Sequence, residues 1–501
     1  MAVFHVLLNW ASQALVFLVF LLFVAFLGYC LYIKHIHMKY DHIPGPPRDS
    51  FFFGHTATFW RIMNNDEVMH DKFLEWAKIY GPVYRVNVLH YLILCVSCPE
   101  ATKEILMSPK YLKDSFYKRL FNLFGQRFLG NGLLTARDHE QWYKQRRIMD
   151  PAFSSLYLRG LMDTFNDRAE KLMSKLTDIA DSKAETHMLN LLNRVTLDVI
   201  AKVAFGVDLD LLNNSSPFPK AIEACLKGLL YYARDPLFQF KPKNRSFINE
   251  VREACRLLRK TGAKWIHERK TAMENGEDVP KDILSQIIKS AGQEENMTKE
   301  DEEFMLDNFV TFFIAGESKQ QLIYWLFAPW NLPDILIVRQ EVDDVIGMKQ
   351  DISYDDLGRL IYLSQVLKET LRIYPTAPGT SRELPEDMVI AGIHIPGGCS
   401  CLFNPYVTGR LEKFFKDPLT FDPDRFHPDA PKPYYCYYPF ALGPHSCLGQ
   451  NFAQMEAKVV MAKLLQRFDF TLVPGQSFDI LDTGTLRPKS GVLCSVRHRN
   501  H

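Results

Sequence analysis

The ten residues from Phe440 to Gly449 constrain the fold of this chain more than any other segment. They close a long stretch rich in proline and glycine and lead into Gln450–Phe468, whose apolar residues recur at helical spacing. We therefore expect Gln450–Phe468 to be an amphipathic helix, with Cys447 just ahead of its N-terminus. The helix dipole and the free backbone N–H groups at such a place favour a thiolate.

The neighbours of Cys447 suit a flat ligand with an anionic edge. Gly443 and Gly449 would let the backbone approach such a ligand closely. Phe440 would cover its ligating side, and His445 would donate a hydrogen bond to its edge. A cysteine flanked by glycines is weak evidence alone, and the complete ten-residue arrangement is much stronger.

The other cysteines have no such setting. The chain has ten, and their positions show no paired CxxC spacing of the kind that holds structural zinc. We expect nine of them to be small buried hydrophobic residues, which suits a reducing compartment.

The overall charge excludes one class of partner. The chain has 501 residues with 59 basic and 58 acidic side chains, a formal net charge of +1. Such a balance gives no electrostatic footprint for nucleic acid. The 36 Phe and 21 Tyr residues suit either an enclosed apolar ligand or an ordinary large core.

The N-terminal segment predicts a membrane anchor. Ala14–Ile33 is an uncharged run of 20 residues, which as a helix spans the hydrocarbon core of about 30 Å. The basic residues Lys34, Lys39 and Arg48 follow it, so the downstream side is expected in the cytosol. A cleaved signal peptide is the alternative, although the segment lacks a basic start and a clear cleavage site.

Periodicity beyond the anchor predicts a mainly α protein with small β-sheets (α+β). Helical periodicity dominates from residue 50 to about 375, as in Leu158–Leu176, with a strand pair at Val83–Val88 and Tyr91–Val96. A long irregular meander follows, from Pro375 to Pro444. We expect an anchor at residues 1–41, a proline-rich hinge at 42–49, and a single cofactor-binding body at 50–501.

Two helical pairs stand out by spacing. Glu369 and Arg372 are three residues apart and share a helix face, which alone usually means a surface ion pair. Trp142 and Arg146 are four apart and likewise share a face.

Together these motifs resemble the cytochrome P450 family. Its haem-binding loop reads F-x-x-G-x-[RH]-x-C-x-G, and its E-x-x-R, P-E-R-F and W-x-x-x-R motifs resemble Glu369–Arg372, Pro423–Phe426 and Trp142–Arg146. The resemblance implies the cytochrome P450 fold and haem b, with Cys447 as the axial thiolate. It also implies propionate contacts from His445, Trp142 and Arg146, and an ion-pair cluster of Glu369, Arg372 and Arg425 behind the haem.

The central helix departs from the family pattern A-G-x-[DE]-T. The chain reads Ala315-Gly-Glu-Ser-Lys-Gln-Gln321, and one deletion after Gly316 restores an acid–alcohol pair as Glu317 and Ser318. We take these two as the candidate catalytic residues for proton delivery. Pro329 interrupts what the family resemblance implies to be helix.

The residues expected to line the substrate pocket come from two segments. They are Phe312, Phe313 and Ala315 on the central helix, and Thr376, Ala377 and Thr380 after E-x-x-R. For the two phenylalanines, core packing is an equally good interpretation.

Several longer segments resemble the cholesterol 24-hydroxylase branch of the family, including Gly81–Val88, Asp307–Gly316 and Asp356–Glu369. This resemblance implies a monooxygenase acting on a sterol or similarly bulky lipid. It also implies a single-pass protein of the endoplasmic reticulum membrane, with electrons from NADPH through cytochrome P450 reductase. The basic residues Lys144, Arg147 and Lys458 are candidates for docking that reductase.

Two alternatives remain open because the central helix is altered. One is a haem-dependent peroxide isomerase, which needs neither dioxygen nor the acid–alcohol pair. The other is a divergent paralogue that binds haem and sterol without turnover.

Overall fold

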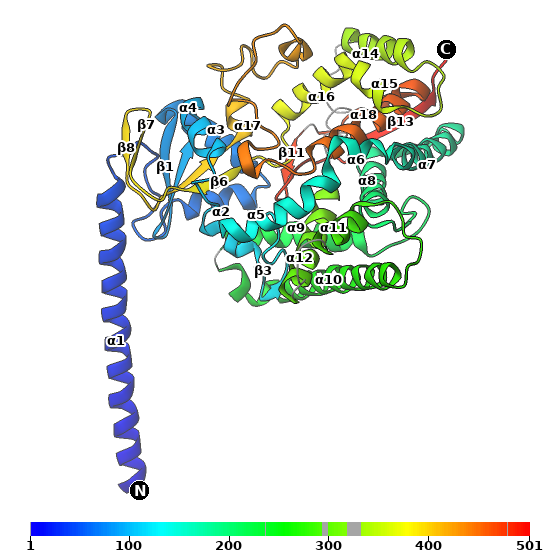
Figure 1. The fold of residues 1–501 in the computed structure, drawn as a ribbon. Helices are drawn as coiled ribbons and strands as arrows, with labels where there is room; N and C mark the ends of the chain where they lie inside the picture. The colour runs from blue at the N-terminus through cyan, green and yellow to red at the C-terminus, as the bar shows by residue number, and fades with distance from the viewer. Residues whose placement is uncertain (1, 236, 293–298, 318–331, 478, 501) are drawn as a thin grey trace.

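The computed structural model describes residues 2–235, 237–292, 299–317, 332–477 and 479–500. A long N-terminal helix, α1, projects from a mainly helical body that carries small sheets (Figure 1). The α+β fold class predicted from the sequence is confirmed. The expected interruption at Pro329 lies outside the described residues.

Helix α1 runs over Ala2–Tyr40 and is longer than the predicted span of residues 14–33. Within it, Asn9–Tyr40 is long and apolar enough to cross a membrane. The C-terminal end of α1 packs on the body, where Tyr29 Oη lies 2.9 Å from His90 Nδ1. Most of the helix makes no contact with the body in Figure 1, as expected for a membrane anchor.

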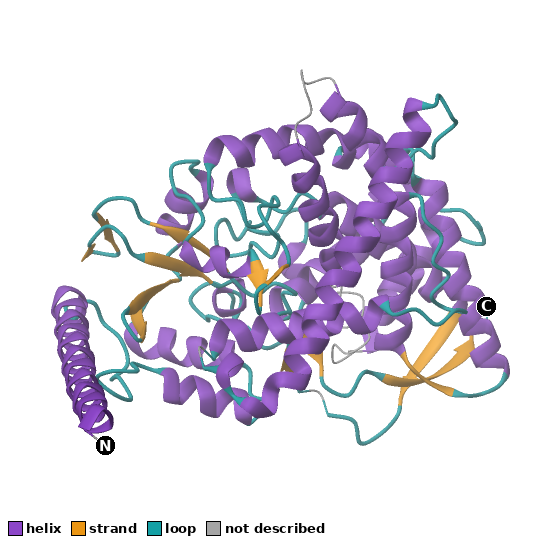
Figure 2. Ribbon diagram, turned by 90° about the horizontal axis from the view of Figure 1, so that it is seen from below, coloured by secondary structure: helices purple, strands orange, loops and turns teal. Residues whose placement is uncertain are grey.

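The main sheet lies at the end of the body from which α1 projects (Figures 1 and 2). Its order is β1-β2-β9-β6, with β2 and β9 parallel and the other pairs antiparallel. Its first hairpin has the predicted bounds. The strands are β1 (Val83–Val88), β2 (Tyr91–Val96), β6 (Thr380–Glu383) and β9 (Ser400–Phe403), with the separate hairpin β7 (Met388–Ile390) and β8 (Ile393–Ile395).

Helices make up most of the body. They are α2 (Thr56–Asn64), α3 (Met69–Tyr80), α4 (Pro99–Met107), α5 (His139–Met149), α6 (Ser155–Arg159), α7 (Met162–Asp181), α8 (Met188–Phe205), α9 (Phe218–Arg234), α10 (Arg245–Glu274), α11 (Ile283–Gly292), α12 (Lys299–Glu317), α14 (Leu332–Val345), α15 (Tyr354–Arg359), α16 (Ile361–Ile373), α17 (Pro405–Thr408) and α18 (Gln450–Arg467). Some of these helices, such as α3, pack directly on the main sheet (Figure 1). The single helix expected at Leu158–Leu176 is two helices, because the chain turns at Gly160 and Leu161.

Smaller elements complete the chain. They are the strands β3 (Asn122–Leu123), β4 (Gln126–Arg127), β5 (Glu185–His187), β10 (Phe468–Leu472), β11 (Ile480–Asp482), β12 (Leu486–Pro488) and β13 (Leu493–His498), and the 3-10 turns η1 (Ser115–Leu120), η2 (Asp150–Phe153), η3 (Phe238–Phe240), η4 (Pro242–Asn244), η5 (Pro423–Phe426) and η6 (Gly443–His445). The irregular meander expected at 375–444 contains four short strands, which are β6, β7, β8 and β9.

The helix after the cysteine loop differs from its prediction. Helix α18 is buried on nearly all sides, and the buried set includes Glu456, Lys463 and Gln466. Lys463 Nζ pairs with Glu170 of α7 at 2.9 Å and donates to Gln350 O at 2.5 Å. The expectation of an amphipathic helix was wrong, because partners distant in sequence bury and pair its polar residues.

Candidate cofactor site

The cysteine loop is held by its own backbone. Cys447 N–H donates to Phe440 O at 2.8 Å, which closes the loop. Helix α18 begins three residues later at Gln450, with Gly449 as its N-cap. Cys447 is exposed, whereas the other nine cysteines are buried or half-buried. The thiol therefore stands accessible at a helix N-terminus, the setting that favours a thiolate.

The two glycines of the loop serve different purposes. Gly443 has φ +68°, and a Cβ there would collide with Leu106 O and lie 2.8 Å from Met107 Cα. It is needed for packing against the end of α4, which differs from the close approach to a ligand expected from the sequence. At Gly449 φ is −84°, and the nearest atom to a Cβ is Cys447 Sγ at 4.0 Å.

Three of the expected propionate contacts lie together. The rings of Trp142 and His445 have centroids 4.0 Å apart. Arg146, one turn further along α5, donates from Nη1 to Ser446 O at 2.8 Å. Both ring nitrogens of His445 are buried and have no hydrogen-bond partner among the described residues. Helix α5 thus places Trp142 and Arg146 against the cysteine loop.

Sequence reasoning missed two further basic residues at this place. Arg382 of β6 is 1% exposed, and its Nε and Nη2 have no hydrogen-bond partner among the described residues. Lys113 Nζ is buried and donates to Leu133 O and Leu134 O, each at 2.7 Å. Their burial depends on contacts distant in sequence, so no local pattern could have identified them.

Neighbouring positive charges add to the effect of burial on two pKa values at this site. Burial, followed by Lys113 and Arg382, lowers the pKa of His445 to about 2. Burial, followed by Arg382 and Arg146, holds the pKa of Lys113 well below its usual value. Arg382 is a buried guanidinium with two unused donors, and such a group requires an anionic partner. The two propionates of a haem, with its iron toward Cys447, would meet that requirement, so the residues present fit haem b.

Behind the loop, the ion-pair cluster is assembled in the buried interior. Arg372 Nε and Nη2 donate to the two oxygens of Glu369, each at 2.7 Å, and both side chains are 0% exposed. Arg425 Nε lies 3.4 Å from Glu369 Oε1. Arg372 Nη1 also donates to Gly409 O at 2.5 Å and to Pro418 O at 2.7 Å. This pairing fixes α16 to the meander that carries the cysteine loop.

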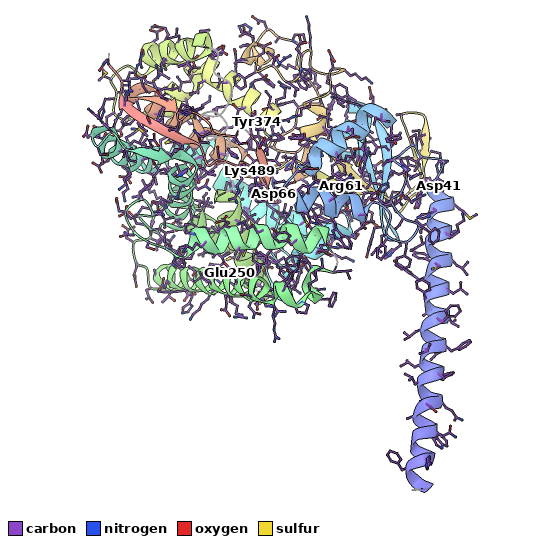
Figure 3. All side chains as sticks on the ribbon, turned by 180° about the vertical axis from the view of Figure 1, so that it is seen from behind. Asp41, Arg61, Asp66, Glu250, Tyr374 and Lys489 are labelled. Atoms are coloured by element: carbon purple, nitrogen blue, oxygen red, sulfur yellow. The ribbon has the colours of Figure 1, made fainter. Side chains whose placement is uncertain are left out.

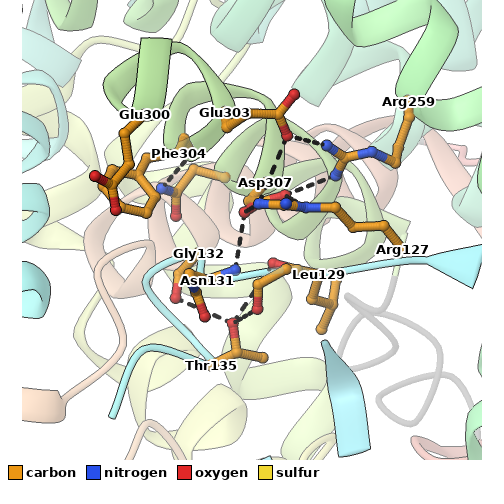
Figure 4. Close-up of polar contacts among 12 residues, drawn as sticks. Arg127, Leu129, Asn131, Gly132, Thr135, Arg259, Glu300, Glu303, Phe304 and Asp307 are labelled. Carbon is orange, nitrogen blue, oxygen red and sulfur yellow. Dashed lines mark hydrogen bonds and ion pairs between the residues drawn. The ribbon is translucent and has the colours of Figure 1, made fainter. Parts of the chain in front are cut away.

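The central helix α12 is anchored at its middle by Asp307 (Figure 4). This fully buried carboxylate accepts from Arg127 Nη2 at 2.7 Å, Arg259 Nη1 at 2.6 Å and Asn131 N–H at 2.8 Å. The next residue, Asn308, accepts from Leu133 N–H at 2.7 Å. Since Leu133 O in turn accepts from Lys113, the anchor also orders the basic site.

The three pocket candidates on α12 face different ways. Phe313 is 0% exposed, and its ring contacts an aromatic group of the core formed by Phe205, Phe218, Trp265 and Phe309. Phe313 is thus a core residue, the second of the two interpretations left open. Phe312 is half-buried beside Phe153, and Ala315 is exposed. Glu317 is the last described residue of α12, with only its backbone placed, and Ser318 lies outside the described residues.

Of the candidates after E-x-x-R, Thr380 is the first residue of β6, and Thr376 and Ala377 lie in the segment just before that strand. Ala377 is exposed, while Thr376 and Thr380 are half-buried. Thr380 Oγ1 accepts from Arg382 Nη1 at 3.0 Å. This segment therefore adjoins the basic site as well.

The comparisons with known proteins agree with this geometry. The family model of cytochrome P450 matches residues 44–495. Cytochrome P450 4d2 of Drosophila melanogaster is 27% identical, over 91% of this chain and 94% of the relative. Cytokinin hydroxylase of Arabidopsis thaliana is 29% identical over 85% of both chains, and 11-oxo-beta-amyrin 30-oxidase of Glycyrrhiza uralensis is 29% identical over 78% of both. The chain belongs to the cytochrome P450 family, whose members are haem-thiolate monooxygenases.

Proposed function

We propose that this protein is a haem-thiolate monooxygenase that hydroxylates a sterol-like lipid, as cholesterol 24-hydroxylase does. One observation supports the haem assignment above all others. The accessible thiol of Cys447 lies in the same loop as His445, which adjoins buried basic groups with unused donors. When bound there, haem b would supply the oxygen-activating chemistry of the family.

The residues of the chain would hold that group and exclude water. Cys447 would ligate the iron, and Phe440 and Gly449 would border the ligated face. The N–H groups of Trp142, Arg146, Lys113, Arg382 and His445 would hold the propionates. We assign proton delivery to the Glu317 carboxylate and the Ser318 hydroxyl, on the alignment with one deletion after Gly316.

The substrate class rests on resemblance and on the exposed part of α12. The segments that resemble the cholesterol 24-hydroxylase branch include Asp307–Gly316, which carries the half-buried Phe312 and the exposed Ala315. One relative, 11-oxo-beta-amyrin 30-oxidase, is named as an oxidase of 11-oxo-beta-amyrin. A sterol-like lipid fits both observations.

We infer a place in the endoplasmic reticulum membrane with the body in the cytosol, and NADPH–cytochrome P450 reductase as electron donor. The uncharged run Ala14–Ile33 of α1 and the basic residues that follow this run support this orientation. Lys144 and Lys458, expected as docking residues, both make contacts within the chain. Lys144 Nζ pairs with Asp301 at 2.7 Å, and Lys458 Nζ donates to Leu357 O at 2.8 Å.

The first test is the reduced, carbon monoxide-bound difference spectrum of the full chain in membranes. We expect the red-shifted Soret band of a thiolate-ligated haem, and its loss in Cys447→Ala. A native-like band retained by Cys447→Ala would overturn the ligand assignment.

Sterol turnover then separates the remaining alternatives. With reductase and NADPH, the proposed enzyme forms a hydroxylated sterol. Peroxide rearrangement without reductase would identify an isomerase. A sterol-induced spectral shift without turnover would identify a non-catalytic binder.

A further inference from the structure

Two guanidinium groups share one carboxylate at the point where α1 enters the body. Arg48 Nη2 donates to Asp41 Oδ1 at 2.5 Å, and Arg85 Nη2 lies 3.5 Å from the same oxygen. Arg48 Nε also donates to Asn87 Oδ1 at 3.1 Å. Figure 3 shows Asp41 at the junction between α1 and the body. The group therefore has more positive than negative charge.

Several donors of this group are buried without an acceptor. They are Arg85 Nε and Nη1, Asn87 Nδ2 and, in the tautomer that carries its proton there, His37 Nε2; none has a hydrogen-bond partner among the described residues. Asn87 is 0% exposed and His37 is 5% exposed. Buried donors are almost always paired in proteins, so four together indicate an acceptor-rich ligand.

The local structure brings these side chains to one place. Arg85 and Asn87 are two residues apart on β1 and share a face of the sheet. Arg85 N–H donates to Pro44 O at 2.8 Å, and a Cβ on Gly45 would lie 2.5 Å from Arg85 O. The proline-rich segment thus packs closely on β1 and fixes Arg85 beside the end of α1.

The last turn of α1 supplies His37, Asp41 follows the helix directly, and Arg48 comes from the proline-rich segment. Asp41 N–H donates to His37 O at 2.9 Å, so the two residues are one helical turn apart. We call His37, Asp41, Arg48, Arg85 and Asn87 the junction cluster.

The height of the junction cluster matches one layer of the bilayer. His37 is four residues beyond Ile33, the end of the uncharged run, or about 6 Å along a helix. The headgroup layer adds about 5–7 Å to each side of the hydrocarbon core. If α1 spans the membrane, as proposed above, the cluster lies among the lipid phosphates.

We propose that the junction cluster is a binding site for the phosphate of a phospholipid headgroup. Arg85, Asn87 and His37 provide hydrogen-bond donors, and Arg48 provides a second positive charge. Asp41, whose side chain is 48% exposed, is the anion that the phosphate displaces. Guanidinium groups suit this role because their fork matches two phosphate oxygens.

The test uses the full chain, purified in a non-ionic detergent and examined by native mass spectrometry. Phosphatidic acid should bind as a single adduct per chain, and diacylglycerol, which lacks the phosphate, should not. Inorganic phosphate should compete only at concentrations at least a hundredfold higher. Competition at equal concentration would overturn the lipid as the source of the phosphate, and binding of diacylglycerol would overturn the phosphate site itself.

Four variants separate recognition from structural support. We expect Arg85→Gln to reduce the adduct at least tenfold, Arg85→Lys to reduce it less, and Asp41→Asn to increase it. Arg256→Gln removes a charge from an exposed ion pair on α10 and should leave the adduct unchanged. An unchanged adduct in Arg85→Gln, or a weaker one in Asp41→Asn, would overturn the proposal.

Two controls keep this test independent of the proposals on which it rests. Each variant must retain the carbon monoxide spectrum of the wild type, which shows an intact haem site. Resistance of α1 to alkaline carbonate extraction tests the membrane anchor separately. Loss of the adduct with both controls intact therefore concerns the junction cluster alone.

Discussion

Arg372 binds both carboxylate oxygens of Glu369, at 2.7 Å each, in an interior where neither side chain is exposed. The remaining hydrogen-bonding groups of the pair find partners in the meander, which lies next to them in space. Asp422 N–H donates to Glu369 Oε1 at 2.9 Å, and Arg372 Nη1 donates to two backbone carbonyls of the meander. The pair therefore connects α16 with the segment that leads to Cys447.

Arg372→Met should be strongly destabilising because it leaves a buried carboxylate with an incomplete set of partners. Breaking a buried pair from one side costs about 3–5 kcal/mol. We expect a lower yield of haem-containing protein and a clear fall in the temperature at which the Soret band is lost. The matched control is Arg256→Gln, since Arg256 and Glu253 form an exposed pair worth about 0.2–1 kcal/mol. Equal effects of the two substitutions would contradict the structural role given to Arg372.

The two glycines of the cysteine loop should respond differently to alanine. Gly443→Ala places a Cβ against the backbone of α4 at a φ of +68°, so it should impair folding whether or not haem is present. Gly449→Ala meets ordinary φ and free space within the chain, so the apoprotein should fold normally. If a flat cofactor lies over Gly449, this variant should instead lose haem affinity. Far-ultraviolet circular dichroism of the apoprotein and haem content of the holoprotein distinguish the two effects, and normal haem content in Gly449→Ala would contradict the close approach.

The sequence predicts what depends on local patterns. The hairpin of Val83–Val88 and Tyr91–Val96 has its predicted bounds because both strands are rich in β-branched and apolar residues on either side of a short turn. The spacing of Glu369 and Arg372 shows that they share a helix face. It does not show that the pair is buried, because that depends on carbonyls of the meander around 40 residues further along.

The sequence fails where partners are distant. Phe312 and Phe313 are neighbours on α12, yet only Phe313 joins the aromatic core, and helical spacing alone does not show which face meets that core. Arg382 and Lys113 come from segments about 270 residues apart and meet only in the folded chain. Of the acid–alcohol pair, only the backbone of Glu317 lies among the described residues, so its role remains a prediction.

Arg382 should contribute directly to haem retention, because its unused Nε and Nη2 can each donate a hydrogen bond to a propionate oxygen. A hydrogen bond to a charged group contributes about 1.5–3 kcal/mol. Arg382→Gln should therefore speed haem transfer to apomyoglobin by about 10-fold or more, since each 1.4 kcal/mol is tenfold. Arg382→Lys should show an intermediate rate because it keeps the charge and loses the fork. An unchanged rate in Arg382→Gln would exclude it as a propionate ligand.

Asp198 should make stability depend on pH independently of the cofactor site. This residue of α8 is 3% exposed and accepts from Leu211 N–H at 2.8 Å through Oδ2, while Oδ1 has no hydrogen-bond partner among the described residues. Burial raises the pKa of Asp198 from 3.8 to about 6. The folded state therefore binds the proton more tightly than the unfolded state, and the charged carboxylate costs up to about 3 kcal/mol above pH 6. That cost diminishes as the pH falls from 6 towards 3.8.

Asp198→Asn removes this titration while keeping an oxygen for Leu211 N–H. We expect the variant to gain stability relative to the wild type by about 1 kcal/mol more at pH 7.5 than at pH 5. Thermal unfolding of both proteins at both pH values measures the difference. His70, whose pKa burial lowers to about 4, has the opposite dependence on pH. Because the folded state favours its neutral form, the contribution of His70 to the stability of the protein is lost as the pH falls below 6.5. That contribution is common to both proteins and cancels in the comparison, so an equal gain at pH 5 and pH 7.5 would show that Asp198 is already ionised at both.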